Sequence, residues 1–599
     1  MDDRELRGLV SRVKSGRMSR RGFIRRMAAV GFTAPMCTQL LALGGVAHAA
    51  PAAAYKPTKA GGGGTLKTLW WQGPTLLNPH FATGTKDSDG SRVFYEPLAA
   101  WGPDGALVPV LAAELPSIAN GGLAEDGRYV IWKLKQGVTW HDGQPFTADD
   151  CVFNWEYCKN PDTAAVTIGS YQDIKVEKVD DYSVKVVFPK PQPFWADAFV
   201  AVNGMIIPKH LFQDFTGTKS REAPTNLKPV GTGPYLFESF TPGDLLTGKI
   251  NPHYHVPNQP YFDAIQMKGG GDAVSAARAV LQTGEYDFAW NLQVEDEVLK
   301  KIEAGGKGRV LIVVGGGNIE HIQCNFSDPR TTVDDQRSSI KTQHPTLQYP
   351  EVRQAVALCV NRDAVQQYIY GRTGEATDDY INDPKQFRSP NMKGEFNVQK
   401  AADMLEKAGW KVGSDGVREK DGKKLQYLFQ TSINEPRQKT QAIVKQACGK
   451  AGIGIEIRSV VASVFFSSDV SNPDTYPHFY ADLQMYTDNP TQPDPGVWVR
   501  SFLSSEVAQK ENKWQGRNVT RWRSSEYDKL WNDADKEVDP TKRAALFIKM
   551  NDLVVSNVVV IPVIWRRGVA AAAKDLQNVR PAGWDGDYWD LPGWFKEST

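Results

Sequence analysis

Strand-like and helix-like segments alternate along almost the whole chain of 599 residues, and this alternation limits the possible folds more than any other feature. Strands are expected at residues 66–71, 128–134, 182–188, 453–460 and 479–487, where apolar and polar side chains alternate or a short apolar run ends at a turn. Helices are expected at residues 149–159, 275–283, 352–370, 398–408 and 437–451, with two more between 530 and 557 that break at Asp539-Pro540. The pattern predicts a large mixed α/β protein, a class that places ligands in crevices between sheets or lobes.

The charge of the chain is nearly balanced, with 70 Lys and Arg against 69 Asp and Glu. A nucleic-acid binder needs a concentrated basic surface, so nucleic acid is excluded as a partner. The balance is uneven along the sequence, because residues 1–49 hold nine basic and three acidic side chains. The basic N-terminal segment therefore needs an explanation of its own.

Residues 1–49 have the three parts of an export signal. The adjacent Arg20 and Arg21 precede an apolar stretch at 27–46, and Ala47-His48-Ala49 supplies small residues for cleavage. Paired arginines indicate the twin-arginine route. The alternatives are a membrane anchor, although glycines and a proline dilute the stretch, and a lipoprotein at Cys37. We expect a protein cleaved near Ala49 and released into the periplasm, with residues 50–64 as a flexible linker.

The sequence contains none of the familiar catalytic or phosphate-binding motifs, and we expect neither an enzyme nor a cofactor. Five cysteines follow the apolar stretch without a C-x-x-C pair, so buried free thiols are expected rather than a metal cage. His253 and His255 form an H-x-H pair, but two ligands fall short of a closed metal site, and no metal is predicted. His141 precedes the turn Asp142-Gly143 and is expected to be structural.

Several blocks in a fixed order resemble the family 5 extracytoplasmic solute-binding proteins of ABC transporters, a group that includes dipeptide-, oligopeptide- and nickel-binding proteins. The blocks span about residues 65–565, nearly the whole chain after the linker. They are Phe94–Leu98 (FYEPL), Gly137–Asp150 (GVTWHDGQPFTADD), Gly231–Tyr235 (GTGPY), Gly284–Asp287 (GEYD), Val352–Val356 (VRQAV), Ala401–Trp410 and Tyr527–Leu530 (YDKL).

The resemblance implies a periplasmic-binding-protein-like fold of the large three-lobe type (class II), with mixed sheets and an interdomain ligand cleft. It further implies a hinged trap that closes around a ligand and then docks on a membrane permease. The expected lobe I comprises residues 65–105, 229–318 and a return with the C-terminal tail at 561–599. The expected lobe II is inserted at 106–228, and the expected lobe III spans 319–560.

Asp488 is the first candidate ligand residue, because it follows the strand 479–487 and strand ends line crevices in α/β folds. It also occupies a position where peptide-binding members of the family look similar. A peptide ammonium enclosed in a cleft needs such a carboxylate. The alternative is an aspartate that only forms the turn in Thr487–Pro490.

Aromatic and amide side chains supply the other candidates. Trp71 and Trp290 follow strands and would offer apolar surface to peptide side chains or sugar rings, with core packing as the alternative. The remaining candidates are Asn291, Asn325, Tyr486 and Trp498, and Arg437 and Arg500 for a ligand carboxylate.

These inferences predict the periplasmic solute-binding subunit of an ABC importer, expected as a monomer that delivers a di- or oligopeptide to a permease and ATPase complex. An opine, an oligosaccharide or a nickel chelate is the alternative ligand. A secreted hydrolase, or a sensor or chaperone with the same fold, is the alternative from another class.

Overall fold

The computed structural model describes residues 56–597 except 104, 314, 491 and 538, and nine residues of the first 55: Leu9, Arg12, Val13, Met18, Ser19, Gly22, Phe23, Arg26 and Met27. Arg20, Arg21 and the predicted cleavage point therefore lie outside the described residues. In the part that is described, no helix combines the length and the apolar character needed to cross a bilayer.

A seven-stranded mixed sheet is built from both ends of the chain, in the strand order β11-β21-β10-β1-β9-β8-β7. Its central strand β1 pairs in parallel with β9 and with β10, whereas β21, from the C-terminal part, runs antiparallel between β10 and β11. The helix α8 begins at the side-chain cap of Asp272. The elements of this region are β1 (Thr65–Trp70), α4 (Thr85–Arg92), β7 (Tyr235–Thr241), β8 (Leu245–Ile250), β9 (Ala264–Gly269), α8 (Ala273–Leu281), β10 (Phe288–Ala289), α9 (Asp296–Glu303), β11 (Gly308–Ile312), β21 (Val569–Ala573), β22 (Leu576–Gln577) and β23 (Phe595–Lys596).

A smaller region lies between α4 and β7 in sequence and carries the three-stranded sheet β4-β6-β5. Its main helix, α5, begins at Thr147, which forms a capping box with Asp150. The elements here are β2 (Ala99–Trp101), β3 (Leu107–Pro109), β4 (Tyr129–Lys133), α5 (Ala148–Lys159), α6 (Ile168–Tyr171), β5 (Lys175–Asp180), β6 (Ser183–Val187) and α7 (Lys209–Phe212).

The third region is a six-stranded mixed sheet in the order β13-β20-β12-β19-β17-β18, covered by helices. Asn434 caps α13 and Asp539 caps α16, each with its side chain. The elements are β12 (Ile319–Cys324), α10 (Pro350–Leu358), α11 (Arg362–Val365), β13 (Gly374–Ala376), α12 (Val398–Lys407), β14 (Lys411–Val412), β15 (Arg418–Lys420), β16 (Lys423–Lys424), β17 (Gln426–Ser432), α13 (Glu435–Lys450), β18 (Gly454–Val460), α14 (Ala462–Phe465), β19 (Leu483–Asp488), α15 (Ser525–Ala534), α16 (Pro540–Ser556) and β20 (Val560–Arg566).

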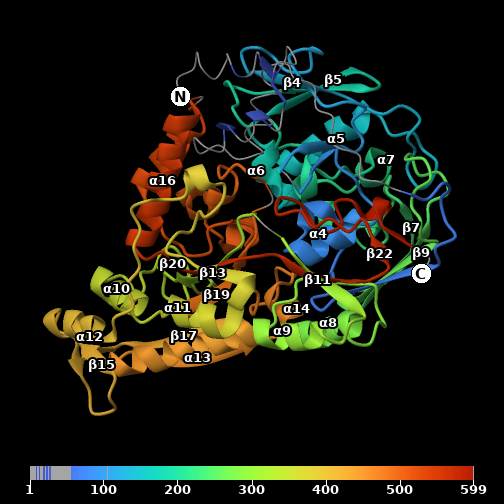
Figure 1. The fold of residues 1–599 in the computed structure, drawn as a ribbon. Coiled ribbons are helices and arrows are strands. Elements are labelled where there is room, and N and C mark those ends of the chain that lie inside the picture. Colours follow the sequence, from blue (N-terminus) through green and yellow to red (C-terminus); the bar gives the residue numbers. More distant parts are fainter. Residues whose placement is uncertain are drawn as a thin grey trace.

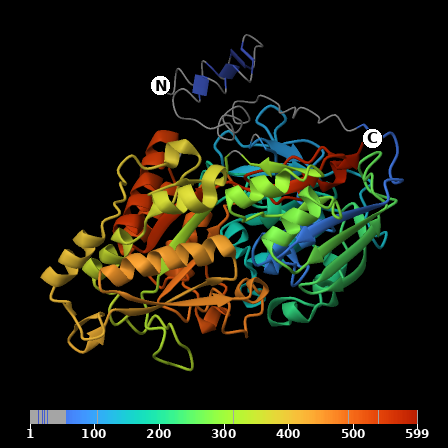
Figure 2. The ribbon, with the colours of Figure 1, turned by 60° about the horizontal axis from the view of Figure 1, so that its bottom comes forward.

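The hydrophobic cores divide the molecule into two bodies. One core contains both Trp70 of the seven-stranded sheet and Trp132 of the small sheet, so these two regions form one packed unit, called here the first body. The six-stranded region, called here the second body, has cores of its own around Phe429 and Phe547. Figures 1 and 2 show the two bodies side by side, with α10, α12 and α13 at one end and β7 and β9 at the other.

The chain crosses between the bodies at residues 313–318, after β11, and at 567–568, after β20. The expected return to the first sheet at residue 561 falls inside β20, which pairs with β12 of the second body as far as Trp565. The chain therefore leaves the six-stranded sheet after Arg566 and joins the seven-stranded sheet with β21. Each crossing contains glycine, and Gly315 and Gly316 have φ angles of +102° and +90°, which only glycine adopts readily.

Most expected elements are found within a few residues of their predicted limits, and the prediction of a mixed α/β fold is confirmed. The helix expected at 352–370 is wrong as a single element. The chain leaves α10 at Leu358, and the Asn361 side chain accepts a hydrogen bond from the Ala364 N–H, which starts α11. The five described cysteines are buried and unbridged, as predicted.

Candidate functional site

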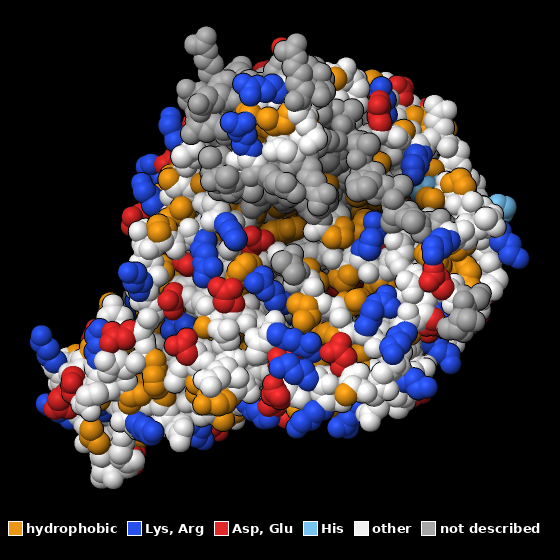
Figure 3. All heavy atoms as spheres, viewed as in Figure 1, with side chains coloured by type: hydrophobic (Ala, Val, Ile, Leu, Met, Phe, Trp, Pro, Cys, Tyr) orange, Lys and Arg blue, Asp and Glu red, His pale blue; other side chains and the backbone are white. Residues whose placement is uncertain are grey.

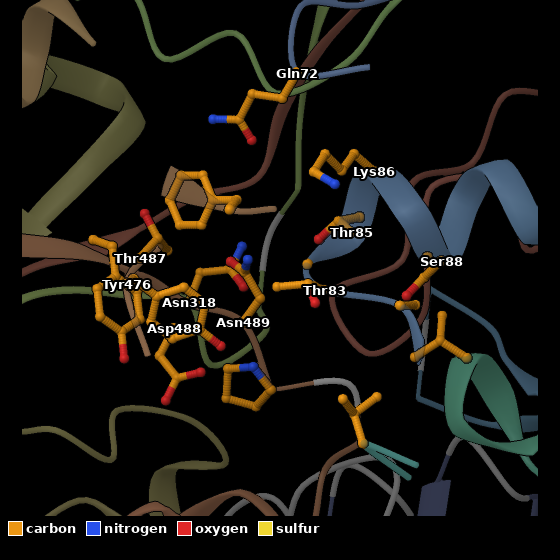
Figure 4. A pocket seen from close by; sticks show the side chains of 18 of the residues that line it. Gln72, Thr83, Thr85, Lys86, Ser88, Asn318, Tyr476, Thr487, Asp488 and Asn489 are labelled. Atoms are coloured by element: carbon orange, nitrogen blue, oxygen red, sulfur yellow. The ribbon is translucent and has the colours of Figure 1, made fainter. Parts of the chain in front are cut away.

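A cavity of about 360 Å³ lies where the two bodies meet. The first body contributes Gln72, residues 82–88, Trp290 and Asn291, and the second body contributes residues 466–470, 475–478 and 486–490, among others. Figure 4 shows Thr83, Thr85 and Lys86, at the start of α4, facing Thr487, Asp488 and Asn489 across the space. The lining is a mixture of polar and aromatic side chains, as in sites that bind small molecules in proteins.

Asp488 is the last residue of β19 and lines the cavity. Its Oδ2 accepts a hydrogen bond from the Tyr380 hydroxyl, and burial raises the pKa of Tyr380 well above its ordinary value, so this tyrosine remains a donor. Among the described residues, no Lys, Arg or His nitrogen lies within 4.0 Å of the Asp488 carboxylate. The carboxylate thus faces the cavity with a hydrogen-bond donor behind it and without a cation beside it.

Trp290 and Asn291 line the cavity directly after β10. The Trp290 ring is stacked on Trp70 at 6.0 Å between centroids. Trp71 does not line the cavity; its indole Nε1 donates to the Asn291 carbonyl at 2.9 Å, and its ring packs 6.1 Å from Trp290. Trp71 therefore holds two lining residues in place from behind.

Tyr486 and Trp498 line the cavity from the second body. The Tyr486 hydroxyl accepts a hydrogen bond from Gln323 at 3.1 Å, and the Trp498 ring packs on Tyr380 at 5.1 Å. Both candidate aromatic residues therefore lie in the part of the lining that includes Asp488.

Arg437 lines the cavity, but its charge is already matched. Its Nε lies 2.7 Å from Glu320 Oε1, and its other nitrogens donate to Ser432 and Thr487. Burial by itself would raise the pKa of Glu320. The positive charge and hydrogen bond of Arg437 act in the other direction, and the pKa of Glu320 is lowered overall. This ion pair makes Arg437 part of the cavity wall.

Asn325 and Arg500 do not line the cavity. Asn325 is fully buried, and its amide donates to the carbonyls of Phe479 and Ala481, so it fixes the chain that leads into β19. Arg500 pairs with Glu506 at 2.6 Å and donates to the Gly169 carbonyl at 2.8 Å. Since Gly169 belongs to α6, Arg500 joins the second body to the first.

Most lining residues were not predicted from the sequence, among them residues 466–470, 475–478 and 514–517, the segment at the start of α4, and Arg566. The segment Thr83–Ser88 is polar and carries no motif, although Lys86 is buried in an ion pair with Asp87 at 2.7 Å and burial lowers the pKa of Lys86. Arg566 ends β20, so the strand-end rule that selected Asp488 would have selected it too.

The histidines of the quoted motifs are structural. His141 Nδ1 accepts from the Gly231 N–H at 3.1 Å, and its Nε2 donates to the Gly233 carbonyl at 3.0 Å, which ties the WHDGQPF block to the GTGPY block. His255 Nε2 lies 2.9 Å from Glu96 rather than beside a second ligand, and His253 is exposed.

Comparison with known proteins agrees with this geometry. The family model of bacterial extracellular solute-binding proteins, family 5 (middle), matches residues 106–506. Oligopeptide-binding protein AppA of Bacillus subtilis is 28% identical over 475 residues, which cover 77% of this chain and 78% of AppA.

Two solved structures share the fold. AppA of Bacillus subtilis in complex with a nonapeptide has a TM-score of 0.76 and 23% identity and covers 91% of this chain and 100% of its own. NikZ of Campylobacter jejuni in complex with Ni(L-His) has a TM-score of 0.74 and 22% identity, with 89% and 99% covered. The predicted periplasmic-binding-protein-like fold is confirmed, and the chain belongs to the family 5 bacterial extracellular solute-binding proteins.

Proposed function

We propose that this protein is the periplasmic solute-binding subunit of an ABC importer and that it captures a short peptide in the cavity between its two bodies. The observation that carries the proposal is the Asp488 carboxylate, which lines the cavity, has no cationic partner among the residues that the structure describes, and lies beside the ring of Tyr380, on which Trp498 packs. A peptide ammonium would supply the missing charge, and the rings would supply contact area without selecting one side chain. Relatives named as oligopeptide- or peptide-binding proteins support this choice of ligand.

The proposed action is transfer without chemical change. Peptide binding favours the arrangement in which both bodies contact the ligand, and this shifts the population from open to closed molecules. The closed form then docks on a permease in the membrane, and the ATPase drives release. A basic, twin-arginine signal in the first 49 residues would bring the folded chain to the periplasm.

The Asp488→Asn variant tests the proposal, because it removes the charge and keeps the size of the side chain. Loss of a charge pair that is enclosed from water costs roughly 2–5 kcal/mol of binding free energy. Titration calorimetry of the purified protein with a panel of di- to pentapeptides measures the affinity. We expect the variant to bind free peptides far more weakly than the wild type, and N-acetylation of the peptide to weaken the wild type alone.

The matched control is Asp126→Asn, which changes an exposed carboxylate of the first body by the same atoms. It should bind peptides as the wild type does. If the wild type binds no peptide of the panel, the proposed ligand is wrong; if Asp488→Asn binds as well as the wild type, Asp488 is not the ammonium partner.

A further inference from the structure

Among the described residues, the two large sheets end in four edge strands, and three of these are protected against pairing with a further strand. β13 has only three residues, and β7 carries a bulge between Phe237 and Ser239. In β11, the Val310 N–H donates to Glu303 Oε1 at 3.0 Å, so a side chain occupies the edge. Short length, bulges and covered edges are common protections of this kind. The fourth edge strand, β18, has none of the three in the part of the chain that the structure describes.

The backbone of β18 leaves a row of hydrogen-bonding groups free. The strand is seven residues long and pairs with β17 without interruption. The Gly454 N–H donates to the Leu425 carbonyl, so the even-numbered residues of β18 direct their N–H and C=O groups towards β17. The groups of Ile455, Ile457 and Ser459 therefore point to the open edge. None of the described residues bonds to them there.

Apolar side chains are exposed along the same edge. Ile457 lies at the centre of β18, and Val461 follows the strand directly. Ile433, whose N–H donates to the Val460 carbonyl, is exposed at the same end. An unpaired, regular strand with exposed apolar side chains gains from being covered by another strand.

The charges of β18 indicate which strand would cover it. Glu456 and Arg458 are two residues apart, so they project from the same face of the sheet. When two copies of β18 pair in antiparallel order with Ile457 opposite Ile457, each Glu456 lies opposite the Arg458 of the other copy. The same register places Ile455 opposite Ser459, so the free backbone groups of one copy meet those of the other. One register thus satisfies the charges and the backbone together.

The two charged side chains are available for this pairing. Glu456 is exposed, and no Lys, Arg or His nitrogen of the described residues lies within 4.0 Å of its carboxylate. Arg458 forms an ion pair with Asp474, and its side chain remains partly exposed. A guanidinium group has five N–H donors, so Arg458 can bond to a second carboxylate without releasing Asp474.

We propose that the protein forms a symmetric dimer through β18, in which the two six-stranded sheets join into one continuous sheet. A two-fold axis at Ile457 makes the interface self-complementary, because each residue meets the same partner in both copies. The partner is a second copy of this chain, since the opposite charges of β18 match those of its own copy. The dimer differs from the monomer expected from the sequence, and it does not depend on the proposed function.

Sedimentation equilibrium of the purified protein over a wide range of concentration measures the dimer. The wild type is compared with Glu456→Arg, Arg458→Glu and the double variant. Each single change places like charges opposite each other twice, so each should lower the association constant by at least about tenfold. The double variant restores opposite charges and should regain most of the association. Glu125→Arg is the matched control, because Glu125 is an exposed carboxylate of the first body, and it should associate as the wild type does.

Cysteine cross-linking tests the register. Ile457→Cys places the two introduced thiols beside the two-fold axis, with about 5.5 Å between Cα atoms. Val461→Cys is also exposed on this edge, but its two copies would lie eight residues apart, which is about 27 Å. A short thiol cross-linker should therefore join Ile457→Cys into a covalent dimer and leave Val461→Cys monomeric on a denaturing gel. The described native cysteines are buried, and the wild type measures their background.

The wild-type measurement needs no variant, and thermal unfolding checks that each variant folds. A wild type that is monomeric at every concentration would overturn the dimer and leave the edge to an extended segment of another protein. A dimer that persists unchanged in both single variants, or that cross-links through Val461→Cys and not through Ile457→Cys, would show that another surface forms the interface.

Discussion

At the scale of single residues, burial fixes the charge of a histidine in the first body. His80 is fully buried, with its Nδ1 2.9 Å from the Thr167 hydroxyl and its Nε2 2.8 Å from Asn154 Oδ1. This arrangement suits a neutral ring that donates from Nε2 and accepts at Nδ1. Burial lowers the pKa of His80 to about 4, although the contact with Asn154 opposes the shift.

The lowered pKa of His80 predicts a loss of stability in acid. The unfolded chain takes up a proton near pH 6.5, whereas the folded protein does so only near pH 4. The stabilisation is therefore complete above pH 6.5 and disappears as the pH falls towards 4, by up to about 3 kcal/mol. His80→Gln should reduce this part of the pH dependence of the free energy of unfolding, measured by urea titration, and cost about 1–3 kcal/mol at pH 7.

The control for this prediction is His253→Gln, since His253 is exposed. It should keep the wild-type slope between pH 6.5 and 4. The same slope in His80→Gln would show that His80 does not control the loss.

The sequence predicted that a side chain reaches the cavity only where its position at the end of a strand places it there. Asp488 could be predicted to reach the cavity because it ends β19. The partners of the arginines could not be predicted. Glu320, which neutralises Arg437, lies 117 residues away in sequence, and no local pattern distinguishes the paired Arg437 from Arg566.

At the scale of elements, a short helix connects the two bodies beside the cavity. Arg500 lies in the 3-10 helix Trp498–Phe502, whose first residue lines the cavity, and donates to the Gly169 carbonyl in α6 of the first body. Lys190 of the first body forms an ion pair with Asp535, just after α15. Under the proposed mechanism, these contacts form only when the bodies are together, so they would favour the closed arrangement.

Arg500→Met is expected to weaken peptide binding although Arg500 does not line the cavity. Loss of a hydrogen bond to a charged group costs about 1.5–3 kcal/mol, and here the cost falls on the closed form. The affinity measured by calorimetry should fall about tenfold or more. Glu506→Gln is the control, because it breaks the ion pair within the second body and leaves the contact with Gly169; an equal effect of both variants would contradict the assignment.

In most places, the local side chains predict where a helix or strand begins and ends. Thr147, Asn434 and Asp539 cap helices where the sequence has the expected side chains and spacing. The division of 352–370 into two helices was not predicted, because its apolar pattern continues across the break. The helix restarts where the Asn361 side chain accepts a hydrogen bond from the Ala364 N–H. The order of strands in each sheet depends on pairing between distant segments and was not predicted from the residues.

At the scale of the whole molecule, charged side chains of both signs are mixed over the visible surface, with no field of one sign (Figure 3). This agrees with the nearly balanced composition. The main division is between the two bodies, which are linked through the crossings at 313–318 and 567–568 in the described part of the chain. The proposed closure would use these two short links as the hinge between the bodies.

The proposed mechanism predicts that the molecule becomes more compact when a peptide binds. Small-angle X-ray scattering of the purified protein should give a smaller radius of gyration with a saturating tripeptide than without it. Arg500→Met should be more extended than the wild type without peptide. An identical scattering curve with and without a peptide that calorimetry shows to be bound would contradict closure.

The position of β21 has a consequence for the order in which the chain assembles on the ribosome. β21 lies between β10 and β11, and Tyr588 reaches back to Thr68 with a hydroxyl contact of 2.7 Å across 520 positions. The six-stranded sheet is complete once β20 has emerged. At that moment β10 and β11 of the seven-stranded sheet still lack β21, the strand that pairs with both of them. The half of the molecule that is translated first is therefore the last to finish folding, and a nascent chain that stalls after residue 566 would expose those edges to aggregation.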